Sequence, residues 1–175
     1  MPYFESSIWI LIGLITGSFS NVCIDRLPLQ FSDNEFRSQL LKSSKLAPNL
    51  KKLLKERKVT LYKPTRSFCF WCGYQLQWFE NIPLISYILI KGHCRACKIA
   101  IPSRVFLTET MHGLLYGIFG WFFQFWVWSF FAGINFSFLW ILAYCRSHQQ
   151  LRCKLYYAGG ILLMVNLMLY FFVSK

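Results

Sequence analysis

The sequence predicts an all-α protein of the membrane class, with about four transmembrane helices and one long polar loop. Three observations lead to this fold class. Hydrophobic residues make up 55% of the 175 residues and aromatic residues 19%, while charged residues make up only 15%, against roughly 25% in a typical soluble domain. Uncharged runs of near-spanning length recur along the chain. The basic residues are concentrated between these runs, as expected when they select one side of a membrane.

Residues 1–24 are expected to hold the first transmembrane helix. Residues 8–24 contain no charge and, at ~1.5 Å per residue, cover most of a ~30 Å hydrocarbon core. A secretory signal is the competing interpretation. However, Glu5 precedes the run, no Lys or Arg does, and basic residues follow it. That order favours a retained helix with its N-terminus outside.

The second half of the chain predicts three more spans. Residues 105–145 contain one acid, Glu109, and no Lys or Arg. That length suits a tight transmembrane hairpin, whose turn we place at Gln124 in the Trp-rich stretch 121–128. Residues 146–154 are expected to form a short loop, and residues 155–175 the last helix.

The basic residues predict the orientation of these spans. Of the 19 Lys and Arg residues, 15 lie within residues 25–104 and three within 146–154. Both loops are cytoplasmic, and the positive-inside rule is obeyed, if both termini lie outside. The charge excess is explained by topology and lacks interleaved aromatic residues, so nucleic-acid binding is not expected.

Residues 25–66 are predicted to be a basic cytoplasmic segment. It holds "KKLLKERK" at 51–58, with Leu50, Leu53 and Leu54 at a helical spacing, and Pro48 interrupts any longer helix. Two interpretations stay open. The segment either rests on anionic membrane lipid or forms a solvated cytoplasmic helix.

Residues 67–104 carry two Cys-x-x-Cys pairs, and these predict a metal site. Cys69 and Cys72 are separated from Cys94 and Cys97 by 21 residues, close to the spacing of a four-thiolate zinc ribbon. Disulfides are disfavoured in a loop that faces a reducing cytosol. A redox motif needs one pair, whereas two matched pairs are present. We therefore expect one structural zinc ion in a cytoplasmic loop.

The stretch between the two cysteine pairs is apolar. Asn81 is expected to cap a helix that has Pro83 in its first turn. Residues 82–90 form an uncharged, mainly apolar run of nine residues, too short to span a bilayer. This stretch is therefore expected to lie in the membrane interface or to pack under the zinc site.

Four motifs, taken in order, resemble the type IV prepilin peptidases, also called leader peptidase/N-methyltransferases. They are "GLITGSFSNVCIDRLP" at 13–28, the paired Cys-x-x-Cys, "WFENIPLISY" at 78–87 and "SRVFLTE" at 103–109. The resemblance covers residues 13–115, the amino-terminal portion of the family. It implies a multi-pass protein of the bacterial inner membrane that acts in type IV pilus or type II secretion pilin maturation.

The resemblance also implies a chemistry and its partners. Family members cut the leader from prepilins and pseudopilins, then methylate the new N-terminal amine with S-adenosylmethionine. The zinc-bearing loop is linked with methylation. Cleavage is performed by two aspartates, the second in a Gly-x-Gly-Asp motif.

The aspartate motifs are missing from this sequence. After Glu109 there is no Asp or Glu, and the stretch 142–155 has Arg146, His148 and Lys154 where acids are expected. Two carboxylates are needed so that one acts as base and the other as acid. We therefore expect no peptidase activity from this chain alone. The first hypothesis is a truncated or split member that methylates or joins a separate aspartate-bearing chain, and the alternative is a non-catalytic membrane module that binds prepilin or a secretion-system partner.

Several residues are candidates for the site. Glu80, Asn81 and Glu109 are candidates for methyl transfer or substrate contact. Gly17, Ser18 and Asn21 either let two helices approach closely or line a substrate groove. Glu109 and His112 share a helix face, as a functional pair or as a buried hydrogen-bonded pair. Asp25 and Arg26 are expected to pair with each other or to meet lipid phosphate.

Overall fold

The structure is a computed structural model that describes residues 2–31, 34–42, 46–56, 59–123, 126–145 and 149–173. Its secondary structure is helical, and the described residues contain no strand beyond two isolated bridges. The predicted all-α class is confirmed. The elements in chain order are α1 (Pro2–Gln30), α2 (Asn34–Lys42), α3 (Pro48–Lys55), the 3-10 helix η1 (Trp78–Asn81), α4 (Ile85–Leu89), α5 (Ser103–Phe122), α6 (Trp126–Cys145) and α7 (Gln149–Val173).

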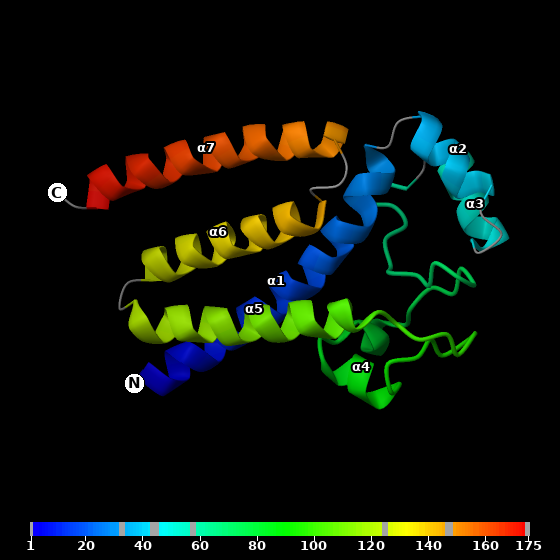
Figure 1. Cartoon of the computed structure of the whole chain (residues 1–175). Helices are drawn as coiled ribbons and strands as arrows, with labels where there is room; N and C mark the ends of the chain where they lie inside the picture. Colours follow the sequence, from blue (N-terminus) through cyan, green and yellow to red (C-terminus); the bar gives the residue numbers. More distant parts are fainter. Residues whose placement is uncertain are drawn as a thin grey trace.

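The long helices form one bundle, and the short elements gather at one end of it. Figure 1 shows α5, α6 and α7 lying alongside one another, with α1 running obliquely past α5. The start of α1 and the end of α7 lie at the same end of the bundle. At the opposite end lie α2, α3 and residues 67–102, which we call the cysteine loop.

Two helices have the length and apolarity of membrane spans. They are α1, over Phe4–Gln30, and α6, over Trp126–Cys145. Both are judged on length and composition alone, which a buried core helix or a signal sequence also satisfies. The helices α5 and α7 have 20 and 25 residues but do not reach the same apolarity within the residues described. The four predicted spans therefore stay a prediction.

Two helices extend beyond the expected boundaries. The first helix continues past residue 24 to Gln30, because Asp25 and Arg26 find partners in the protein and stay helical. The last helix begins at Gln149, within the loop expected at 146–154. Its first turns are buried through Leu151 and Leu155, which pack against Cys145. The predicted turn at Gln124, and Arg146 and His148, lie outside the described residues.

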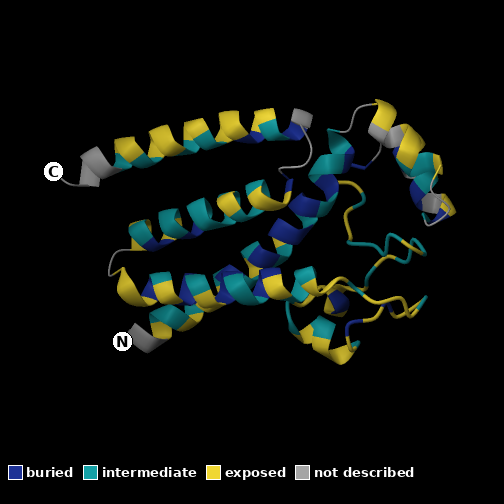
Figure 2. Ribbon diagram, viewed as in Figure 1, coloured by how far each residue is buried: buried dark blue, intermediate teal, exposed yellow. Residues whose placement is uncertain are grey.

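The helices α1 and α5 pack closely through glycines, and we call this contact the α1–α5 seam. A Cβ on Gly17 would lie 2.9 Å from Glu109 Cα, and one on Gly13 would lie 2.8 Å from Tyr116 Cβ. Such distances leave no room for a side chain. Figure 2 shows dark blue, buried residues along both helices here. Three glycines of α5 likewise leave room for side chains of α1. They are Gly113 against Leu14, Gly117 against Ile10 and Gly120 against Trp9.

The basic segment 25–66 forms a small core of its own. Pro48 begins α3, a position where its missing N–H has no cost. Leu50 and Leu54 are almost fully buried and pack with Leu29 of α1 and with Phe68. The side chain of Leu53 lies outside the described residues. These two leucines therefore face the protein and are not free to enter lipid.

Candidate metal centre and adjoining pocket

The four predicted cysteines come together in one cluster. Their Sγ atoms all lie within 4.8 Å of one another. Cys69 Sγ is 3.8 Å from Cys97 Sγ, and Cys72 Sγ is 3.9 Å from Cys94 Sγ. A tetrahedron of thiolates at a Zn–S distance of about 2.3 Å has edges of about 3.8 Å. A disulfide needs about 2.05 Å. The four-cysteine cluster is consistent with a zinc site.

The two cysteine pairs sit on matching turns of the cysteine loop. The N–H of Gly73 donates to the carbonyl of Cys69, and the N–H of Lys98 donates to the carbonyl of Cys94, both at 2.9 Å. Gly73 and Lys98 have φ values of 74° and 58°, which tighten each turn. One bridge closes each turn, Phe68 with Gln75 and His93 with Ala100. This local repeat aims two sulfurs from each turn at one point.

The pKa values of two sulfurs in the cluster shift in opposite directions. Burial raises the pKa of the Cys69 thiol to about 12. Burial also acts on Cys94, but backbone N–H groups of Cys97 and Ala96 donate to its sulfur, and its pKa is lowered. A bound cation deprotonates such thiols, because the metal ligand is the thiolate. The donor set therefore suits a divalent ion that binds with release of protons.

Glu80 is a buried carboxylate beside the cluster. Its Oε2 accepts hydrogen bonds from Tyr74 Oη at 2.9 Å and from the Gln77 N–H at 2.7 Å. The hydrogen bond to this carboxylate raises the pKa of Tyr74. Its Oε1 has no hydrogen-bond partner, and Nη1 of Arg95 lies 3.8 Å away. The bond from the Gln77 N–H is one half of a capping box at the start of η1, and the other half is a bond from the Glu80 N–H to the Gln77 side chain.

Glu109 holds a strained turn at the start of α4. Its Oε2 accepts the N–H of Leu84 at 2.8 Å, and Ser18 hydrogen-bonds the same carboxylate. Leu84 has φ 59° and ψ −50°, and the N–H of Ile85 reaches back to the carbonyl of Pro83 at 2.6 Å. That is a γ-turn of the rare, strained kind.

This turn corrects the expected helix of residues 82–90. Because Leu84 departs from helical geometry, only Ile85–Leu89 is α-helical. Asn81 ends η1 and does not cap α4, and Pro83 precedes the helix instead of lying in its first turn. The carboxylate of Glu109 explains the difference, because it accepts the Leu84 N–H and so holds Leu84 in a non-helical conformation.

Glu109 and His112 have separate partners in the structure. His112 is fully buried, with Nδ1 2.8 Å from the carbonyl of Thr108 and Nε2 3.3 Å from Ser20 Oγ. The imidazole therefore joins α5 to α1, while Glu109 binds Leu84 in the cysteine loop. Both are buried hydrogen-bonded groups, and no hydrogen bond between them is found among the described residues.

Arg26 fastens residues 60–66, which lead into the cysteine loop, to α1, a role that the sequence did not reveal. It is buried, and its guanidinium donates to four backbone carbonyls within residues 60–66. The acceptors are Thr60 at 3.3 Å, Leu61 at 3.1 Å, Pro64 at 2.6 Å and Arg66 at 3.0 Å. Its hydrogen bonds therefore go to these carbonyls, while the expected protein partner, Asp25, binds Arg104. Adjacent charges in "IDRLP" were the one available signal.

Arg104 closes the seam at the same end of the bundle. Its Nη2 donates to Asp25 Oδ1 at 2.6 Å, and its Nη1 donates to Asn21 Oδ1 at 3.3 Å. Asn21 in turn donates to the carbonyl of Val105 at 3.1 Å. The end of α1 and the start of α5 are thus tied by three hydrogen bonds.

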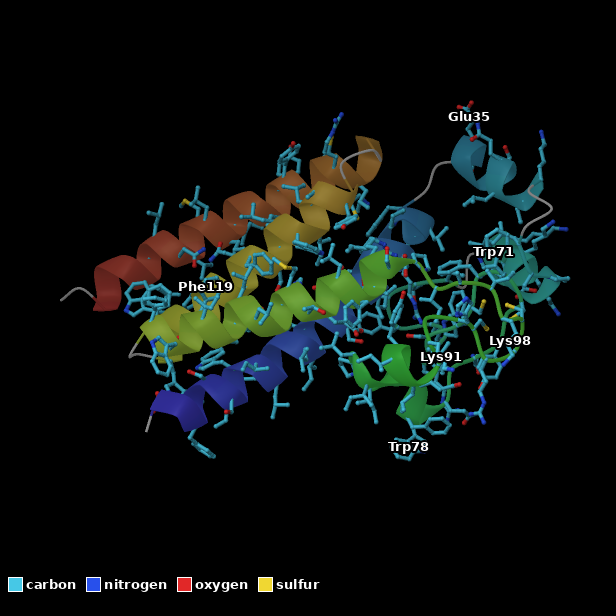
Figure 3. All side chains as sticks on the ribbon, turned by 60° about the horizontal axis from the view of Figure 1, so that its bottom comes forward. Glu35, Trp71, Trp78, Lys91, Lys98 and Phe119 are labelled. Atoms are coloured by element: carbon cyan, nitrogen blue, oxygen red, sulfur yellow. The ribbon has the colours of Figure 1, made fainter. Side chains whose placement is uncertain are left out.

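A cavity of about 290 Å³ lies between α1, α5 and the cysteine loop. Trp71, on the turn of the first cysteine pair, is labelled in Figure 3 at this end of the molecule. Of the predicted site residues, Gly17 does not line the cavity, because it lies in the α1–α5 seam. The predicted residues that line it are Ser18, Asn21, Glu80, Asn81 and Glu109, together with Cys69 and Cys94.

Comparisons with known proteins match this part of the chain. Residues 11–123 match a family model described as the bacterial peptidase A24 N-terminal domain. The prepilin leader peptidase/N-methyltransferase of Pseudomonas aeruginosa is 38% identical over 116 residues, which are 66% of this chain and 38% of that protein. The protein of the same name from Vibrio cholerae is 33% identical over 109 residues, 62% of this chain and 35% of its own length. The chain therefore spans less than two fifths of these relatives, and no solved structure matches it.

Proposed function

Since the chain belongs to the bacterial peptidase A24 N-terminal domain family, we propose that it forms the zinc-bearing and substrate-holding part of a prepilin leader peptidase/N-methyltransferase. In this role it acts in type IV pilus or type II secretion pilin maturation. Its partners are then a prepilin or pseudopilin, membrane lipid and residues that carry the peptidase aspartates. The observation that carries the proposal is the convergence of Ser18, Asn21, Glu80, Asn81 and Glu109 on one cavity beside the cysteines.

The proposed zinc is structural. Cys69, Cys72, Cys94 and Cys97 would hold it, and four thiolates leave no open position for a reacting water. When bound, the ion supplies a fixed cross-link between two turns that lie far apart in the sequence. The turns form one wall of the cavity, through Cys69, Cys94 and the residues beside them. Zinc thus acts on substrate only by shaping this wall.

The cavity is the proposed place of substrate contact and methyl transfer. S-adenosylmethionine supplies a methyl group when it is bound. The described residues would supply the rest of the site. Ser18 and Asn21 form its α1 side, and Glu109 holds the turn at Leu84 that leads into α4. Glu80 and Asn81 offer polar groups in a pocket that five aromatic residues also line.

Leader cleavage is not proposed for these 175 residues alone. Aspartic chemistry needs two carboxylates that share one water. Asp25 is occupied by Arg104, and Glu109 by the Leu84 N–H. No Asp or Glu follows Glu109 in the sequence. We propose that the aspartates come from residues outside this sequence, in the same protein or in a separate chain.

The proposed location is the bacterial inner membrane. Two apolar helices and the family membership support a membrane protein. The cysteine loop lies at the end of the bundle opposite to the start of α1 and the end of α7 (Figure 1). The concentration of basic residues in 25–104 supports a cytoplasmic location for this loop, by the positive-inside rule.

A second candidate function is a non-catalytic membrane module that binds prepilin or a secretion-system partner. Asp25 and Glu109 already bind other groups in the protein, which disfavours cleavage by this chain. The same observation favours a binding module. The two candidates differ in one respect. A binding module leaves the mass of every substrate unchanged.

Intact mass spectrometry tests the proposal. The purified protein is incubated in detergent with S-adenosylmethionine and either a full prepilin or a pilin already cleaved. We expect the full prepilin to keep its leader and the cleaved pilin to gain one methyl group, either with the chain alone or after addition of the aspartate-bearing part of a relative. Cleavage by the chain alone would contradict the account. Unchanged masses in every mixture would favour the binding module.

A further inference from the structure

Glu80 stands out because one of its carboxylate oxygens is buried without a hydrogen bond. Its side chain is only 3% exposed. Tyr74 and Gln77 donate to Oε2, which fixes the orientation of the carboxylate. Oε1 receives no hydrogen bond. An unbonded buried carboxylate oxygen costs free energy in the absence of a ligand, so it calls for an explanation.

The unbonded oxygen belongs to a residue that borders two cavities. Glu80 lines the 290 Å³ pocket and also a second cavity of about 370 Å³. Lys91 and Lys98, labelled in Figure 3, line the second cavity. Within the described part of the chain Oε1 has an ion-pair partner in Arg95, whose Nη1 lies 3.8 Å away, beyond hydrogen-bond distance. Arg95 is 58% exposed and lies over the ring of Phe79, so it is a surface side chain that can be displaced.

The other charged groups that line the pocket already have close partners. Asp25 is paired with Arg104, and Arg26 donates to backbone carbonyls. Glu109 accepts from Leu84 and Ser18. Among the described residues that line the pocket, Glu80 is therefore the carboxylate with an oxygen that is buried and receives no hydrogen bond.

The walls around Glu80 suit a cation on an apolar carrier. Five aromatic residues line the pocket, and aromatic faces attract cations within about 6 Å of the ring centre. A primary ammonium has three N–H donors and matches a carboxylate that has one oxygen free. The aromatic residues are Phe68, Phe70, Trp71, Tyr74 and Tyr87.

We propose that Glu80 Oε1 receives a primary ammonium group in this pocket, in place of the Arg95 guanidinium. The inference rests on the proposed function, in which two ammonium groups are at hand. One is the new N-terminus of a cleaved pilin, and the other is the amino-acid end of S-adenosylmethionine. Glu80 is thus a residue that binds substrate or methyl donor and selects the charged amine.

Isothermal titration calorimetry of the full chain in detergent at pH 7 tests this site. The probes are a five-residue apolar peptide amide with a free N-terminus, the same peptide with an acetylated N-terminus, and S-adenosylmethionine. The variants are Glu80→Gln and Arg95→Gln. The matched control is Glu35→Gln, which removes an exposed carboxylate on α2 outside the pocket (Figure 3). Zinc content measured on every variant reports whether the cysteine loop is intact.

The two variants are expected to act in opposite directions. Glu80→Gln keeps an acceptor for Tyr74 and Gln77 but loses the charge, so binding of the free-amine peptide weakens about tenfold or more. Arg95→Gln removes the competing cation, so the same binding tightens by up to about fivefold. The acetylated peptide binds weakly to every variant. General damage to the loop would weaken both variants and would not give opposite signs.

The two sources of the ammonium are separated by the probes. A site for the substrate amine binds the peptide with the free N-terminus, and a site for the methyl donor binds S-adenosylmethionine. Either result supports the proposal if Glu80→Gln abolishes the preference for the probe that carries the free ammonium. The proposal is overturned if the wild-type chain binds neither probe, or if Glu80→Gln binds both as the wild type does. Methylation of a cleaved pilin by Glu80→Gln at the wild-type rate would overturn this inference and leave the proposed function standing.

Discussion

The helix pairs α1–α5 and α6–α7 differ in how their members meet. Glycines let the backbones of α1 and α5 approach closely at the seam, and the buried His112 of α5 hydrogen-bonds Ser20 of α1. In contrast, α7 is mostly exposed in Figure 2, with Tyr157 79% and Ile161 68% exposed. The family match covers residues 11–123 and so includes the first pair but not the second. The pair that carries the pocket is therefore the tightly packed one, while α7 keeps a surface free for lipid or for other helices.

The largest expected effect concerns the cysteine loop that the first pair supports. Cys94→Ala removes one of four sulfurs, and we expect zinc content to fall from about one ion per chain to nearly none. Cys153→Ala is the matched control, because Cys153 is exposed on α7 and apart from the cluster. Metal analysis of protein purified under reducing, chelator-free conditions measures both. Equal zinc in the two variants would contradict the four-thiolate site.

The next effect separates the two helix pairs directly. Gly17→Ala places a methyl group 2.9 Å from Glu109 Cα and 3.0 Å from His112 Cβ, atoms that cannot move aside alone. We expect a loss of about 2–3 kcal/mol in the free energy of unfolding. Gly160→Ala on α7 meets no atom within 4 Å and is expected to be neutral or slightly stabilising. SDS titration of the folded fraction in mixed micelles compares them, and equal losses would refute the contrast between the pairs.

A smaller effect tests the strained turn at Leu84. Glu109→Ala is expected to cost about 2 kcal/mol in folding free energy, because a charged acceptor of a backbone N–H is lost. Leu84→Gly relieves the positive φ, so the cost of Glu109→Ala should fall by about 1 kcal/mol in that background. Leu89→Gly in the exposed end of α4 is the control and should show no coupling to Glu109→Ala. Additive losses for Glu109→Ala and Leu84→Gly would mean that the carboxylate does not hold the turn.

The smallest difference compares one asparagine from each pair. Asn21 takes part in two hydrogen bonds between α1 and α5, and Asn166 donates one to Asn135 at 3.0 Å between α7 and α6. We expect Asn166→Ala to cost about 0.6 kcal/mol. Asn21→Ala should cost more, about 1–3 kcal/mol, because it removes two hydrogen bonds and leaves the half-buried Arg104 with one partner fewer. The same SDS titration ranks the two variants, and the reverse order would argue against the tighter first pair.

Features with a local signal were predictable from the sequence. The two Cys-x-x-Cys spacings predicted the cluster, because each pair forms its own turn. The apolar runs predicted the all-α class. Family motifs identified Glu80 and Glu109 as site candidates, and both line the pocket. Their separate roles were not predictable, since these depend on which donors reach each carboxylate.

Features set by distant contacts were not predictable. Asp25 was expected beside Arg26, yet it pairs with Arg104, 79 residues away in the sequence. Arg26 donates hydrogen bonds to carbonyls such as that of Pro64, which lie near it only in the folded protein. The γ-turn at Leu84 follows from Glu109, which approaches from another helix. In each case the sequence offers several possible partners, and tertiary packing determines which of them forms the contact.

The central claim is that zinc organises the cysteine loop against a helix pair that is stable without it. Hydrogen–deuterium exchange of the full chain in detergent, before and after removal of zinc by a chelator, tests this claim most directly. The account predicts faster amide exchange in residues 67–102 after chelation, with α1 and α5 unchanged along the seam. Exchange that stays the same in residues 67–102, or that rises equally in α1 and α5, would contradict it.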